Sequence, residues 1–179
     1  MMMKAVEPVR LLGDPVLRRR SELVTHVGRD TEAIIEDLVR TVDAANGLGL
    51  AAPQIGVLKR VVVVVSIDDQ GGRHHYPLIN PEIVSACGEE VREEGCLSIP
   101  GIYAEVKRPQ SVVVRALDKA GKKVNMEASG VLARALAHEI DHLEGMLFID
   151  RIGVVKRNLL RSKLNAIRKM AKEMASSRS

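Results

Sequence analysis

The sequence predicts an α+β fold built on antiparallel sheet. Its strand-like segments cluster between two helical segments and do not alternate with helices, as they would in a parallel α/β fold. The chain has 179 residues, of which 46% are hydrophobic and 28% charged, as is typical of a globular protein. No linker or internal repeat interrupts it, so we expect residues 1–179 to form a single domain.

The first helix is predicted after about thirty irregular residues. Asp30 can cap its start, apolar residues recur at helical spacing from Ile34 to Ala45, and Asn46-Gly47 can end it. The next ten residues, 47–56, are small and apolar apart from one amide, Gln54. From position and composition alone, Gln54 would be read as a surface turn residue after a proline.

The strands follow this segment. Val61 to Val65 is an uninterrupted β-branched run, which is typical of a buried strand. Two pairs of segments are separated by turn signals, Gly71-Gly72 and residues 118–121. The further strands are expected at residues 76–84, 91–94, 102–106, 111–117 and 123–128.

Two more helices are predicted in the last third of the chain. Residues 131–143 are mostly good helix formers with an apolar stripe, and they lie between Ser129-Gly130 and a possible left-handed cap at Gly145. A basic helix is expected at about residues 154–175. From Arg151 onward there are nine Lys or Arg and one acidic residue, Glu173. The excess of basic residues that gives the chain its formal net charge of +4 therefore lies in this tail.

Composition also excludes some classes of protein. The aromatic residues are Tyr76, Tyr103 and Phe148, with no Trp, so the stacking platforms of a single-strand nucleic-acid binder are missing and we expect no DNA partner. No apolar run approaches the ~20 residues of a membrane span, and no secretory signal is visible. Two cysteines fit a reducing cytoplasm. The basic triplet at residues 18–20 leaves an organelle open, and Cys87 is interpreted as an incidental thiol.

The most informative stretch is H-E-x-x-H, at residues 138–142 within the predicted helix of residues 131–143. On a helix, His138 and His142 lie one turn apart on the same face, where two imidazoles can bind one metal ion. Glu139 lies beside them as a candidate general base. The alternative is a pair of partly buried helix residues whose rings are satisfied by carboxylates.

A catalytic divalent metal needs three protein ligands and one open position. No His follows His142, Glu144 and Asp150 are too close in sequence to fold back easily, and Glu173 lies on the expected basic helix near the terminus. Upstream, Cys96 lies beside Gly95 at the start of an expected strand, and its thiolate would suit Fe(II) or Zn(II). Alternatively, Cys96 is a small buried hydrophobic residue.

Three motifs together resemble the signature motifs of peptide deformylases: G-L-G-L-A-A-P-Q at residues 47–54, E-G-C-L-S at 94–98 and H-E-I-D-H at 138–142. The resemblance extends from about residue 9 to 152. It implies antiparallel sheets packed around a central metal-binding helix, with a C-terminal helix. The implied activity is removal of the N-formyl group from the N-terminal formylmethionine of newly synthesised polypeptides, in a bacterial-type cytoplasm.

The resemblance also implies roles for individual residues. Cys96, His138 and His142 would hold one divalent ion, natively Fe²⁺, for which Zn, Ni or Co can substitute, with a water in the fourth position. Glu139 would take the proton of this water and return it to the departing amine. Gln54 and the backbone N–H of Leu97 would stabilise the oxyanion.

The implied substrate is an extended formylmethionyl peptide that pairs with backbone edges. Gly47, Gly49 and Gly95 would leave room for another backbone to approach. The methionine side chain would fill a pocket lined by Leu48, Val131 and Ala135, with His138 in its wall.

Three charged residues need a separate interpretation. Arg134 stands where an apolar pocket residue is expected, and Arg92 stands near a second such position, so each either points outward or narrows and polarises the pocket. Asp141 is interpreted as a partner that orients a ligand histidine or pairs with Arg108. The alternative for Asp141 is a solvated helix charge.

The basic C-terminal helix is either a solvated face or, as the cotranslational role of the family implies, a contact with ribosomal RNA. Two other functions compete with deformylation. One is a peptidase that uses the same helix, which the upstream cysteine ligand and the missing downstream ligand disfavour. The other is a metal-stabilised, noncatalytic protein that binds the ribosome.

Overall fold

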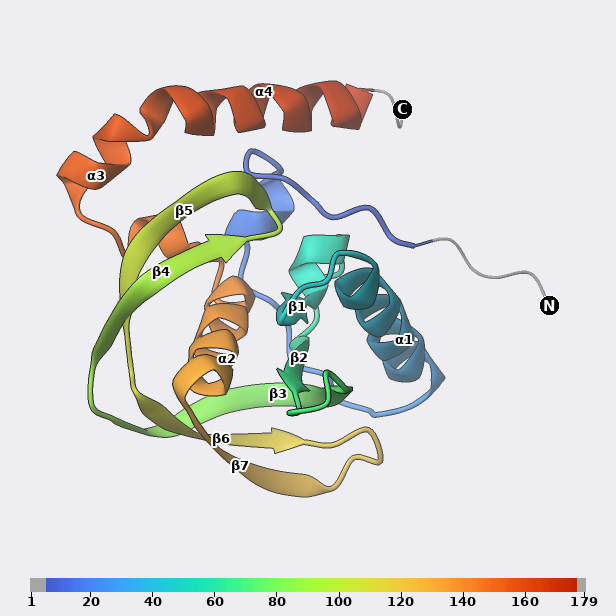
Figure 1. Cartoon of the computed structure of the whole chain (residues 1–179). Helices are drawn as coiled ribbons and strands as arrows, with labels where there is room; N and C mark the ends of the chain where they lie inside the picture. The colour runs from blue at the N-terminus through green and yellow to red at the C-terminus, as the bar shows by residue number, and fades with distance from the viewer. Residues whose placement is uncertain (1–5, 177–179) are drawn as a thin grey trace.

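In the computed structural model, which describes residues 6–176, one helix lies between two antiparallel sheets (Figure 1). The larger sheet has the strand order β1-β2-β3-β6-β7, and the smaller one pairs β4 with β5. Every named strand pair is antiparallel. The α+β fold with a C-terminal helix is confirmed.

The elements run in the following order along the chain. The strands are β1 (Gly49–Ala51), β2 (Val61–Ile67), β3 (Arg73–Cys87), β4 (Glu90–Cys96), β5 (Ile99–Arg108), β6 (Ser111–Leu117) and β7 (Lys123–Ser129). The α-helices are α1 (Arg29–Ala44), α2 (Gly130–Leu143), α3 (Val154–Leu159) and α4 (Arg161–Ser176). Short 3₁₀ helices are η1 (Pro15–Arg18), η2 (Ala52–Ile55) and η3 (Phe148–Asp150).

Strand β2 explains why its sequence is an uninterrupted run of valines. Val62 and Val64 pack into the core shared with α2, whereas Val61, Val63 and Val65 pack into the core shared with α1. Because both faces of the strand are covered, both sets of alternating positions must be apolar. The prediction of a buried strand at Val61 to Val65 is therefore confirmed.

Helix α2 is fixed at both ends and along one face. Gly130 has a φ of +58°, which lets the chain turn directly from β7 into the helix. Leu136, Ile140 and Leu143 pack on the larger sheet. Gly145, with a φ of +73°, follows the last turn, and a Cβ there would lie 2.7 Å from the carbonyl oxygen of Arg18. The predicted helix and its glycine cap are both confirmed.

Two predicted boundaries differ from the structure. Helix α1 begins at Arg29 with Gly28 in the N-cap position, so Asp30 lies in the first turn, where its charge favours the positive helix end. The C-terminal helix is divided at Leu160 into α3 and α4. Only α4 has buried residues, Leu164 and Ile167, which join the core beside β5.

The shortest elements were not predicted. β1, η1, η2 and η3 contain three or four residues each, too few to show a periodicity. Within residues 6–176, no helix is both long enough and apolar enough to cross a lipid bilayer.

Candidate metal centre and active site

The fold brings residues from α2 and β4 together. His138 and His142 lie one turn apart on α2, as predicted, and both are buried. Cys96 is the last residue of β4, immediately before the turn into β5. The prediction that Cys96 begins a strand is therefore wrong. The strand ends there because the chain reverses tightly, and Cys96 pairs with Ile99 across the turn.

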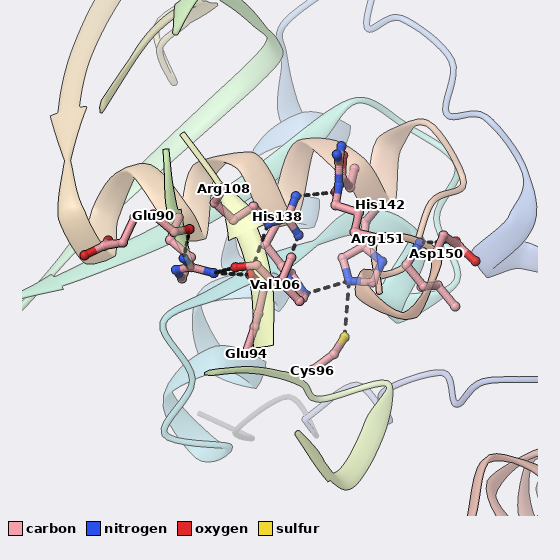
Figure 2. Close-up of polar contacts among 12 residues, drawn as sticks. Glu90, Glu94, Cys96, Val106, Arg108, His138, His142, Asp150 and Arg151 are labelled. Atoms are coloured by element: carbon pink, nitrogen blue, oxygen red, sulfur yellow. Dashed lines mark hydrogen bonds and ion pairs between the residues drawn. The ribbon is translucent and has the colours of Figure 1, made fainter. Parts of the chain in front are cut away.

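The three side chains form a compact cluster (Figure 2). The Nε2 atoms of the two histidines are 3.2 Å apart, and Cys96 Sγ lies 3.3 Å from Nε2 of His142. A tetrahedral ion with ordinary bond lengths would separate two nitrogen ligands by about 3.3 Å and nitrogen from sulfur by about 3.6 Å. The ligand atoms lie within 4.8 Å of one another, so this donor set fits one divalent ion.

Glu94 supports the first histidine from behind. His138 Nδ1 lies 2.6 Å from Glu94 Oε1, and Arg108 donates two bonds, of 2.6 and 3.1 Å, to the same carboxylate. A proton on Nδ1 leaves Nε2 free to face the cluster. Burial alone would raise the pKa of Glu94, but the bonds from His138 and Arg108 lower this pKa far below its usual range.

Glu94 lies in the predicted motif of residues 94–98, but the sequence assigned it no role. The sequence feature that could have indicated a role was the position of this acidic residue, two places before the candidate ligand Cys96. Its function depends on a contact with a histidine 44 residues away, which local spacing does not reveal.

Asp141 continues this charged network at the other side of Arg108. Arg108 Nη1 donates to Asp141 Oδ2 at 2.5 Å, and Arg151 adds two bonds of 2.5 Å to the same carboxylate. Asp141 is buried, so the interpretation as a solvated helix charge is wrong and the pairing with Arg108 is confirmed. The network holds α2 against β5, which carries Arg108.

Glu139 lies on α2 with its side chain buried. Its Oε2 atom has no hydrogen-bond partner among residues 6–176, which is unusual for a buried carboxylate and indicates a place for a water or a ligand. Burial raises the pKa of Glu139 to about 7. Burial and the neighbouring His138 lower the pKa of His142, which favours the neutral ring that can bind a metal.

Gln54 lies in η2 and is buried, so the interpretation as a surface turn residue is wrong. Its Oε1 accepts the N–H of Ala51 at 2.9 Å. This bond turns the amide nitrogen toward the cluster, where Nε2 lies 3.2 Å from Ser98 Oγ and 3.6 Å from Cys96 Sγ. Leu97 follows Cys96 in the same turn.

A cavity of about 630 Å³ opens beside the cluster. Its lining includes every residue that was predicted to contact the substrate, together with Tyr103, Arg92 and Arg134. The predicted lining residues found there are Gly47, Leu48, Gly49, Gly95, Val131, Ala135 and His138. Gln54, Cys96, Leu97 and Glu139 also border it, so the cavity reaches the candidate catalytic groups.

The glycines make room for side chains of the protein itself. A Cβ on Gly49 would lie 2.5 Å from Glu139 Oε1, and one on Gly95 would lie 2.6 Å from the ring of Tyr103. At Gly47 the nearest atoms belong to the side chains of Val42 and Leu97, at 3.1 and 3.2 Å. The space beside these residues is therefore already filled, which the sequence did not indicate.

The two unexpected arginines behave differently. Arg134 lies along the cavity with its guanidinium bonded to Glu94, at 2.9 Å, and to the carbonyls of Val106 and Glu90, at 3.1 and 3.0 Å. Arg92 is exposed and pairs with the Glu90 carboxylate at 2.6 Å. Arg134 thus adds a further charged hydrogen-bond donor to the carboxylate that supports His138.

Comparison with known proteins gives a consistent result. A family model described as polypeptide deformylase matches residues 6–158. A peptide deformylase of Thermodesulfovibrio yellowstonii is 45% identical over 159 residues, which are 89% of this chain and 96% of the relative. One of Thermomicrobium roseum is 51% identical over 152 residues, covering 83% of this chain and 86% of the relative.

Solved structures of similar sequence share the fold. The crystal structure of a peptide deformylase from Legionella pneumophila is 41% identical, with a TM-score of 0.84, and the match covers 93% of this chain and 97% of that one. The peptide deformylase from Thermus thermophilus is 39% identical, with a TM-score of 0.85 and coverage of 93% and 99%.

Proposed function

The chain belongs to the peptide deformylase family, metal-dependent hydrolases that remove the N-formyl group from newly synthesised polypeptides, and on this premise we propose a role for each residue of its site. The substrates are peptides that begin with N-formylmethionine. Hydrolysis breaks the bond between the formyl carbon and the methionine nitrogen and releases formate and a free amine.

Cys96, His138 and His142 would hold the ion. The ion is Fe²⁺ in the native enzyme, and Zn, Ni or Co can take its place, since a thiolate with two imidazoles accepts all of these divalent metals. When bound, the ion supplies Lewis-acid activation of water and of the formyl carbonyl. Elemental analysis after anaerobic purification tests the identity of the metal.

Glu139 is the general base. Its unpartnered Oε2 takes a proton from the attacking water, and the same carboxyl group then gives this proton to the departing methionine nitrogen. Gly49 supports this role, because the missing side chain there leaves space for the carboxylate close to the ligands.

Gln54 and Leu97 stabilise the negative charge that develops on the formyl oxygen. The bond from the Ala51 N–H orients the Gln54 amide before the substrate binds, so no reorganisation is needed during the reaction. The backbone N–H of Leu97 is the second donor. Leu97 directly follows the ligand Cys96, which places this N–H next to the metal site.

The methionine side chain lies in the apolar part of the cavity, against Leu48, Val131 and Ala135, with His138 in the wall. Gly47, Gly49 and Gly95 belong to the segments along which the peptide backbone runs. The guanidinium of Arg134 is held by its three acceptors, which leaves the aliphatic stem beside the pocket.

One observation carries this proposal: three ligand atoms from two distant segments converge beside the buried carboxylate of Glu139, whose Oε2 has no hydrogen-bond partner among residues 6–176. The test is formate release from formyl-Met-Ala-Ser by anaerobically prepared enzyme, with mass spectrometry of the peptide. We expect formate and intact Met-Ala-Ser. Cleavage between residues would indicate a peptidase, and a metal-loaded protein that releases no formate would indicate a noncatalytic one.

A second partner is proposed for the basic end of the chain. We propose that residues 1–179 act as one catalytic domain whose basic helices α3 and α4 contact ribosomal RNA. Arg161, Lys163 and Lys172 are exposed on α4, while Leu164 and Ile167 pack into the core. Deletion of α4 would therefore uncover apolar surface, so charge removal at the three exposed positions is the better experiment.

Copelleting with ribosomes should then weaken when these three residues are replaced by Gln, and it should also weaken as the salt concentration rises. Unchanged pelleting of the triple variant would leave the basic tail as a solvated face. Replacement of Ser162, Asn165 and Ser176 by Ala, on exposed positions of the same helix, is the matched control.

A further inference from the structure

Arg73, the first residue of β3, makes a polar clamp that lies outside the metal centre and its supporting network. Its guanidinium contacts three groups at the end of α1 and in the loop that follows. Nε donates to Asp43 Oδ1 at 2.8 Å, Nη1 to Asn46 Oδ1 at 3.2 Å, and Nη2 to the Gly47 carbonyl at 2.6 Å. All three contacts join the β2–β3 hairpin to one short segment.

That segment is one wall of the cavity. Residues 45–49 all border it, as do Val131, Ala135 and His138 of α2. The loop turns sharply at Asn46, which has a φ of +50°, and the Gly47 N–H bonds back to the Val42 carbonyl at 2.8 Å. A left-handed backbone conformation is uncommon for residues other than glycine. The bond from Arg73 to the Asn46 side chain helps to hold Asn46 in this conformation.

The clamp has a consequence for Leu48. In a trans peptide the C=O of one residue and the N–H of the next point in opposite directions. The bond from Arg73 to the Gly47 carbonyl therefore turns the Leu48 N–H away from Arg73. The next peptide plane is also fixed, because the Leu48 carbonyl accepts the Val65 N–H at 2.9 Å.

We propose that Arg73 is a positioning residue for substrate binding: by holding the peptide planes next to Leu48, it sets the wall against which the formylmethionyl peptide lies. This inference rests on the proposed role of the cavity. Arg73 does not border the cavity and does not contact the ligands, so it acts through the loop and not on the reacting atoms.

The carboxylate of Asp43, which accepts a bond from Arg73, is held in its ionised form. His75, on the same strand, has its Nε2 2.8 Å from Asp43 Oδ1, the atom that also accepts from Arg73. Burial would raise the pKa of Asp43, but the bonds from His75 and Arg73 lower it, so this carboxylate stays ionised at neutral pH. A cation near the end of α1 is also favoured by the helix dipole.

The test compares steady-state kinetics on formyl-Met-Ala-Ser for the wild type, Arg73→Met, Arg73→Lys and a control, Arg115→Met. Arg115 is an exposed arginine on β6 of the same sheet. Metal content and thermal unfolding are measured for each variant. We expect Arg73→Met to raise KM by about five- to tenfold and to change kcat by less than about twofold.

Arg73→Lys should give an intermediate KM, because one ammonium group can bond the Gly47 carbonyl but cannot reach all three acceptors. If Arg73→Met does not fold, the KM of Arg73→Lys is compared with that of Arg115→Met instead. A KM equal to that of Arg115→Met, or a loss of kcat together with loss of metal, overturns the inference. A wild type that releases no formate would instead overturn the proposed function and the inference with it.

Discussion

The carboxylate of Glu139 fills the space beside Gly49, where a Cβ would lie only 2.5 Å from Oε1. These residues are 90 positions apart and belong to different elements, α2 and β1. The contact couples the segment around Gly49 to the H-E-x-x-H helix. A side chain on Gly49 must displace the proposed general base.

Gly49→Ala should therefore reduce deformylation strongly while the protein keeps its metal, because none of the three ligands lies among the nearest neighbours of Gly49. We expect a loss of at least about a hundredfold in kcat, in the range that removal of a general base produces. Formate release and metal content are measured together. Gly153→Ala is the control, since among residues 6–176 no atom beyond the adjacent residues lies within 4 Å of a Cβ there. Full activity in Gly49→Ala would show that Glu139 can move without cost.

Glu94→Gln tests the support of His138. The change removes the charge that Arg108 and Arg134 share and weakens the acceptor of the histidine Nδ1–H. We expect metal affinity to fall about 10- to 100-fold and the free energy of unfolding to fall by about 3–5 kcal/mol. Competition with a chelator and urea unfolding measure the two effects. Glu93→Gln, at the exposed neighbouring position, should change neither.

Metal removal should destabilise the folded chain, because an ion that binds only the folded state adds its binding free energy to stability. We expect a chelator to lower Tm in the wild type and in Cys87→Ser, but not in Cys96→Ser, which should no longer retain the ion. Differential scanning calorimetry with and without chelator measures this. An equal shift in the two cysteine variants would argue against Cys96 as a ligand.

The pair Arg18–Asp150 predicts a pH dependence of stability. Burial would raise the pKa of Asp150, but the bonds from Arg18 and from the Leu147 N–H lower it. A lowered pKa in the folded state means that the stabilisation is complete above the unfolded value, about 3.9, and is lost as the pH falls through the folded value.

Asp150→Asn should consequently be less stable than the wild type at pH 7, by about 1 kcal/mol, and the difference should shrink below pH ~4. Urea unfolding at a series of pH values measures this difference. The control is Asp69→Asn, at an exposed position in the β2–β3 turn. A difference that stays constant down to pH ~3 would contradict the assignment of the effect to the Asp150 charge.

The sequence predicted those parts of the fold whose physics is local. The valine run of β2 is apolar because both of its faces are covered, and the spacing of His138 and His142 places them on one face of α2. In contrast, Cys96 was assigned as a ligand through resemblance to a family, since periodicity carries no information on which distant segments meet.

The parts that could not be predicted depend on contacts between distant residues. Glu94 received no role because its partners, Arg108 and His138, lie on β5 and α2. Arg73 received no role either, because its contact with the Gly47 carbonyl, 26 positions upstream, cannot be read from local spacing. The cap of α1 was misplaced by two residues because Gly28, which offers no side-chain bond, occupies it.

The replacement Glu139→Gln tests the central claim most directly, with metal content and formate release measured on the same anaerobic sample. Glutamine has almost the same shape but cannot accept the proton of the attacking water. We predict that the variant keeps its ion and that kcat falls by about 10²- to 10⁴-fold, whereas the control Glu127→Gln, on the exposed side of β7, keeps both. An unchanged rate in a metal-loaded Glu139→Gln enzyme would contradict the assignment of Glu139 as the base.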